Sequence, residues 1–173
     1  MARPTWDNAR HVLRDFDGTT TDLRVTGLPL GDLDHVLSIC AQLPSVVVTG
    51  FADETVAPKP LDGAWRRRLA SPPTRSGQHV ALLSAQGTPR HLQVYLWVVA
   101  TESLEVECSF WNDLTFPVGI DHDEAEARLE TLLAVVEHCR RTPDIGICVF
   151  SSEHNGPTEE LIEKADDEVV FTW

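Results

Sequence analysis

Basic side chains are scarce in this chain of 173 residues. Lysine and arginine number 14 against 27 aspartates and glutamates, which gives a net charge of -13. A surface this acidic repels phosphate groups, so the composition argues against nucleic acid or an anionic membrane as a partner. Residues 102–173 hold 18 acidic and four basic side chains. Such an asymmetry either marks a surface for a basic partner or serves solubility alone.

Long apolar runs are also missing. No stretch approaches the ~20 residues that a membrane-spanning helix needs. The first ten residues, MARPTWDNAR, lack the apolar core of a signal peptide. The four cysteines form no Cys-x-x-Cys pair, which excludes a zinc ribbon or a thioredoxin motif. These absences predict a cytoplasmic protein, and the apolar surroundings of the cysteines predict buried free thiols. The chain length predicts one domain, residues 1–173.

Several sequence signatures of catalysis are absent. The chain has no Gly-x4-Gly-Lys phosphate loop, no Gly-x-Gly-x-x-Gly fingerprint, no Gly-x-Ser-x-Gly elbow and no His-Glu-x-x-His pair. A protein that is not an enzyme is therefore favoured. We expect no cofactor and no metal ion.

Hydrophobic periodicity predicts an α+β fold in which a mostly antiparallel sheet packs against one long helix and two or three short ones. The long helix is expected over 121–141, with Asp121 as its cap and with i,i+4 ion pairs at Glu124–Arg128 and Glu137–Arg141. Shorter helices are expected near 32–43, 61–70 and 158–165.

The strands are expected in two groups. Alternating apolar residues predict a central antiparallel meander over 79–84, 92–99 and 103–110. The segment 11–26 reads as an N-terminal hairpin, because Asp17-Gly18 is a strong two-residue turn signal. Single strands are expected at 45–50, 145–151 and 168–173.

The meander also suggests a surface for a protein partner. Tyr95 and Trp97 point away from the core side of their strand, and Glu105 and Glu107 do the same on the next strand. If the two strands pair, these four side chains share one face. Aromatic rings among carboxylates suit a basic partner. The alternative is that another helix covers this face.

One short motif has a catalytic counterpart. The run DFDGT at 15–19 resembles the first motif of the haloacid dehalogenase phosphatases. The resemblance implies that Asp15 is a nucleophile, that Asp17 is an acid/base, and that both work with Mg²⁺ in a doubly wound parallel sheet. Thr49, in VVVTG, would then be the hydroxyl residue of the second motif. The alternative is that Asp17-Gly18 is only a hairpin turn.

A second resemblance concerns the layout of the chain. The runs RDFDG at 14–18, TDLRV at 21–25 and FWNDLTFP at 110–117 look similar to segments of small acidic immunity proteins from bacterial toxin systems. This resemblance implies a protein without catalytic chemistry that binds and neutralises a toxin with a basic surface. The phosphatase is the alternative function.

Overall fold

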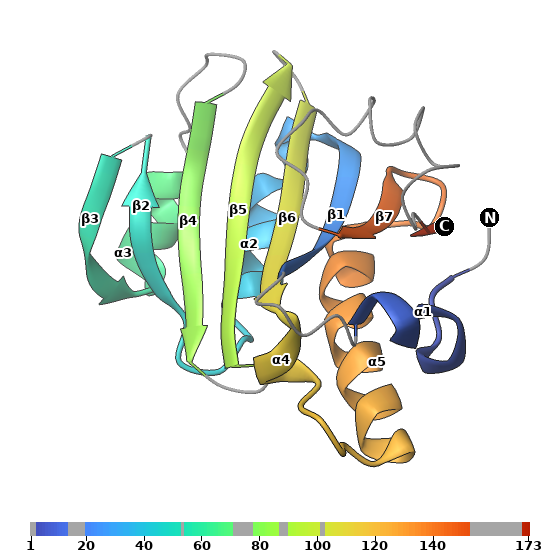
Figure 1. The fold of residues 1–173 in the computed structure, drawn as a ribbon. Coiled ribbons are helices and arrows are strands. Elements are labelled where there is room, and N and C mark those ends of the chain that lie inside the picture. Colours follow the sequence, from blue (N-terminus) through green and yellow to red (C-terminus); the bar gives the residue numbers. More distant parts are fainter. Residues whose placement is uncertain are drawn as a thin grey trace.

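The computed structural model describes residues 3–13, 20–52, 54–70, 78–86, 90–100, 103–152 and 171–173. Figure 1 shows an α+β fold in which helices cover one face of a large sheet. The described strands are β1 (Thr20–Pro29), β2 (Val47–Phe51), β3 (Glu54–Pro60), β4 (Gln78–Gln86), β5 (Arg90–Ala100), β6 (Ser103–Trp111), β7 (Ile147–Ser152) and β8 (Phe171–Thr172). The helices are α1 (Trp6–Leu13), η1 (Leu30–Asp32, a 3₁₀ turn), α2 (Leu33–Cys40), α3 (Gly63–Leu69), α4 (Asn112–Thr115) and α5 (His122–Cys139).

The sheet has the strand order β3-β2-β4-β5-β6-β1-β7-β8. Each neighbouring pair of described strands is antiparallel. The predicted meander is confirmed as β4-β5-β6, and the predicted long helix as α5. The edge strand β3 was not predicted, since Pro58 and Pro60 argue against a strand. Proline is tolerated there because one side of an edge strand makes no ladder hydrogen bonds.

The predicted N-terminal hairpin is wrong in its first half. Residues 11–13 end helix α1 and do not form a strand. Trp6, Ala9 and Leu13 recur at the helical spacing i, i+3, i+7, and all three are buried. These three side chains pack α1 against the rest of the core. The helical spacing of buried residues therefore favours a helix over the predicted strand at residues 11–13.

The second half of the predicted hairpin is a strand with other partners. β1 pairs with β6 on one side and with β7 on the other, both distant in sequence. Asp17 and Gly18 lie outside the described residues, as does the helix predicted over 158–165. The chain therefore places β1 between two strands from its C-terminal half.

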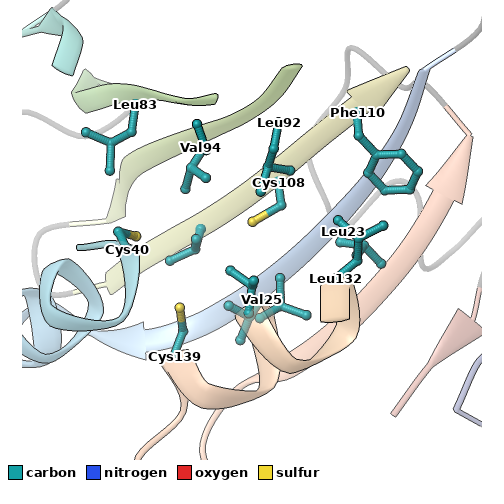
Figure 2. Packing of buried hydrophobic residues seen from close by; sticks show 14 of the residues in the cluster. Leu23, Val25, Cys40, Leu83, Leu92, Val94, Cys108, Phe110, Leu132 and Cys139 are labelled. Carbon is teal, nitrogen blue, oxygen red and sulfur yellow. The ribbon is translucent and has the colours of Figure 1, made fainter. Parts of the chain in front are cut away.

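The core lies between the sheet and the helices behind it in Figure 1. Leu23 of β1 is opposite Cys108 of β6, and Val25 is opposite Val106; all four are fully buried. Figure 2 shows side chains from β1, β5 and β6 pointing toward α2 and α5, and shows Cys40, Cys108 and Cys139 within the same apolar layer. The four cysteines are free and buried, as predicted.

Helix α5 begins at a side-chain cap. Asp121 Oδ1 accepts hydrogen bonds from the backbone N–H groups of Asp123, at 2.9 Å, and Glu124, at 3.4 Å. The predicted ion pair between Glu124 and Arg128 is present. No described helix is long and apolar enough to cross a membrane.

The predicted ion pair between Glu137 and Arg141 does not form, because each residue contacts a distant segment instead. Glu137 Oε1 lies 2.6 Å from Arg3 Nε and accepts a hydrogen bond from Trp173 Nε1 at 2.7 Å. Arg141 instead pairs with Asp32, at 2.7 Å. Arg3 also reaches Glu130, at 2.5 Å, so one guanidinium joins the N-terminal segment to two carboxylates of α5.

Removing the ion pairs of Arg3 with Glu130 and Glu137 should destabilise the protein at neutral pH more than in acid. Burial raises the pKa of Glu137, but the hydrogen bonds from Arg3 and Trp173 outweigh burial, so the net pKa is lowered. A lowered pKa contributes stability that is present above the ordinary carboxyl value and lost as the pH falls below it. Arg3→Met should cost about 1 kcal/mol at neutral pH, a small value because a third-exposed pair is screened by solvent.

Denaturant unfolding across pH measures this loss. Arg10→Met is the matched control, since Arg10 is half exposed and Asp7, at 3.8 Å, is its only acidic partner among the described residues. If Arg3→Met and Arg10→Met lost equal free energies of unfolding at every pH, a stabilising role for the Arg3 ion pairs would be contradicted.

Candidate functional site

The face of the sheet opposite α2 and α5 carries a group of polar and aromatic side chains, which we call the outer face. Strand alternation places them there, because their neighbours in sequence belong to the core. They come from three adjacent strands: Tyr95 and Trp97 from β5, Glu105 and Glu107 from β6, and Asp22 and Arg24 from β1.

The structure brings together the four residues predicted to share a face. In the β5–β6 ladder Tyr95 is directly opposite Glu107, and Trp97 is directly opposite Glu105. Directly paired residues of an antiparallel sheet have Cβ atoms about 5 Å apart, so each ring adjoins a carboxylate-bearing side chain. Among the described helices, none lies across β4, β5 and β6 on this side in Figure 1.

The two aromatic rings form a stacked pair. The ring centroids of Tyr95 and Trp97 are 6.2 Å apart, and the ring planes differ by 18°. The Tyr95 hydroxyl donates a hydrogen bond of 2.6 Å to Gln93 Oε1. Both rings are intermediate in exposure, so part of each remains open to solvent. The pair is thus a flat, preorganised apolar surface.

Beside the rings lies a buried ionic cluster. Arg24 Nη2 is 3.2 Å from Glu107 Oε2 and 3.4 Å from Asp22 Oδ2. Arg24 Nη1 is 4.0 Å from Glu105 Oε1. The side chains of Arg24 and Asp22 are each 5% exposed, so these charges interact in a poorly solvated environment. Asp22 and Arg24 were not predicted as site residues.

The environment shifts the proton affinities of two side chains. Burial raises the pKa of Glu107 from its ordinary 4.5 to about 7. The carboxylates of Asp22 and Glu105 add to this rise, while Arg24 opposes it. Burial also raises the pKa of Tyr95, helped by the charges of Glu107 and Asp22. Glu107 therefore changes charge near neutral pH, which ordinary carboxyl groups do not.

Exposure varies across the outer face. Glu105, predicted as a contact residue, is buried with 7% of its surface exposed, and Val149 and Ser151 of β7 are fully buried. Toward β5, in contrast, Tyr95 and Trp97 are only partly buried and Gln93 is exposed. A partner can therefore reach the rings and the edge of Glu107 more readily than Glu105.

The residues of the phosphatase-like motif are not assembled in the described part of the chain. Asp15 and Asp17 lie outside the described residues. Thr49 lies on β2, which is four strand positions, roughly 19 Å, from β1. The described strands pair only antiparallel, whereas the resemblance implies a parallel sheet. Within the described ranges, no three His, Cys, Asp or Glu side chains are grouped to hold a metal ion.

Comparison of the chain with protein-family models, with curated proteins and with solved structures found no match.

The pKa of Glu107 predicts how Glu107→Gln changes stability with pH. A carboxyl group whose pKa rises on folding contributes stability that is present below about 4.5 and lost as the pH rises toward 7. Because glutamine resembles the protonated acid, the stability of Glu107→Gln relative to wild type should increase across this window, by on the order of 3 kcal/mol.

Chemical denaturation of both proteins at a series of pH values tests this prediction. Glu54→Gln on the exposed edge strand β3 is the control for loss of a carboxylate. A stability difference between Glu107→Gln and wild type that stays constant from acid to neutral pH would show that Glu107 titrates like an exposed acid.

Proposed function

We propose that this chain is a non-catalytic binding protein whose target is a protein with a basic surface, and that it acts as an immunity protein that neutralises a bacterial toxin. One observation carries the proposal: the stacked pair of Tyr95 and Trp97 lies directly across the β5–β6 ladder from Glu107 and Glu105.

The rings supply the apolar part of an interface. Tryptophan and tyrosine are enriched among the residues that dominate binding energy, since they bury a large area and lose little conformational freedom. Stacking fixes the relative orientation of Tyr95 and Trp97 before a partner arrives. The partly exposed rings therefore favour an anchoring role.

The carboxylates supply the charge preference. A lysine or arginine of a partner placed beside Glu107 would lower its pKa from about 7 and stabilise the ionised form. The excess of acidic residues in 102–173 adds a long-range attraction that speeds the encounter with a basic protein. The same charge repels nucleic acid, which supports a protein as the partner.

The proposal is tested with a candidate toxin, a basic protein sought among the products of the genes that neighbour the gene for this chain. Co-expression should restore the growth of cells that make the toxin, and the purified proteins should associate. Trp97→Ala should raise the dissociation rate by about 30-fold, the equivalent of about 2 kcal/mol for a central anchor. Ile147→Ala, exposed on β7 three strand positions from β5, is the control and should change the rate little.

Affinity should also depend on pH and salt. Because Glu107 is neutral below about 7, binding of the basic toxin should tighten as the pH rises through 7, and Glu107→Gln should remove that dependence. Added salt should slow association. Association that is independent of both pH and salt would contradict an acidic contact surface.

The same preparation separates this proposal from the phosphatase alternative. With Mg²⁺ it should not hydrolyse an aryl phosphate above background, and Asp15→Asn should bind the toxin like the wild type. Hydrolysis that Asp15→Asn abolishes in a folded protein would overturn the binding function.

A further inference from the structure

Exposed apolar side chains are concentrated in one short segment. Among the described residues, five large hydrophobic side chains are exposed, and three of them lie within 111–118. Trp111 and Leu114 are each 43% exposed, and Val118 is 80% exposed. We call these three residues the α4 ledge, because α4 carries Leu114 and the other two flank it.

The ledge continues the outer face. Glu105, Glu107 and Trp111 are separated by even numbers of residues along β6, so Trp111 points to the same side as the two glutamates. Leu114 follows three residues later in α4, a four-residue helix that begins directly after Trp111. The polar pair Gln93–Ser109 lies between the Tyr95–Glu107 pair and Trp111, so the ledge is a second apolar patch at the end of β6, next to α4 in Figure 1.

The backbone beneath the ledge is held in place. Phe116 is fully buried, stacks on Trp6 at 5.1 Å and contacts Phe110 edge-on at 6.0 Å. Arg128 Nη1 of α5 donates a hydrogen bond of 2.6 Å to the Thr115 carbonyl oxygen. A partner would therefore meet a surface that is already ordered, which lowers the entropic cost of binding.

Acidic residues outnumber basic ones in the sequence around the ledge, and the Arg128 guanidinium that contacts α4 is paired with Glu124. The sequence contains no lysine or arginine from 102 to 127, and it contains five acidic residues from 111 to 127. Asp113 is exposed within α4 itself. Glu124 is brought toward α4 because it pairs with Arg128, which also bonds Thr115. An apolar surface with acidic neighbours complements a segment that is both apolar and basic.

We propose that the α4 ledge binds an amphipathic, lysine- or arginine-rich segment of the partner protein, with the partner's apolar side chains on Trp111 and Leu114 and its cations beside Asp113. The inference rests on the proposed function and adds to it a second contact region, at the end of β6.

Fluorine NMR of the full chain labelled with fluorotryptophan tests the proposal. The chain has five tryptophans, so the Trp97 and Trp111 signals can be followed separately once assigned with Trp→Phe variants. Trp6, which is 1% exposed, is an internal control for a change of fold. The probe is a synthetic amphipathic helix made of leucine and lysine. Its two controls are a scrambled peptide of the same composition and a peptide with glutamate in place of lysine.

The leucine–lysine peptide should shift the Trp111 signal in a saturable way, and the two control peptides should bind at least about tenfold more weakly. Leu114→Ala should weaken the peptide by about tenfold. Ile147→Ala is the matched control, because Ile147 is exposed to a similar degree but pairs with Thr26, at the far end of β1 from the Thr20–Trp111 pair. It should change the affinity less than about twofold.

The other outcomes overturn the proposal in distinguishable ways. If the peptide shifted the Trp97 signal but not the Trp111 signal, and if Leu114→Ala left its affinity unchanged, the α4 ledge would be refuted as a binding site. The proposed function would not be contradicted by that result. Equal binding of all three peptides, or no binding at all, would refute the ledge as a site for basic segments, and the toxin assay would still judge the proposed function. Binding to anionic vesicles that shifts Trp111 in preference to the peptide would assign the ledge to a membrane instead.

Discussion

The buried guanidinium of Arg24 constrains the arrangement of the outer face. Its side chain is 5% exposed in the middle of the sheet, so its charge requires nearby carboxylates. Asp22 supplies one from the same strand, and the carboxyl group of Glu107, which ionises as the pH rises through about 7, lies 3.2 Å away on β6. Leaving such a charge without a partner costs about 3–5 kcal/mol, so the ionic cluster helps to fix the β1–β6 register.

The same register couples the core to the candidate contact surface. A slip of β1 by one residue would move Leu23 and Val25 out of the core and would carry Arg24 away from Glu107. The β5–β6 pairing is constrained in a similar way, and it places the two aromatic rings beside the carboxylates. The strand register that packs the core therefore also fixes the positions of the outer-face side chains. The net charge of that face depends on how Asp22, Glu107 and Arg24 balance one another.

Local patterns were sufficient to predict much of this arrangement. Alternation along 92–110 predicted the meander and the shared face of Tyr95 and Glu107, because those strands are neighbours both in sequence and in space. The cluster around Arg24 was missed, since β1 pairs with strands that are remote in sequence. Helix α1 was missed for a different reason. Asp17-Gly18 is a strong signal for a hairpin turn, whereas a helix of eight residues shows only three residues of its buried stripe, Trp6, Ala9 and Leu13.

The outer face combines a stacked aromatic pair with a neighbouring carboxyl group, that of Glu107, whose pKa is raised to about 7. The most direct test is a carbon-13 NMR titration of the Glu107 carboxyl in labelled protein, assigned by comparison with Glu107→Gln. The expected midpoint is about 7, because burial and the neighbouring carboxylates outweigh Arg24. A midpoint close to the ordinary value of 4.5 would contradict it.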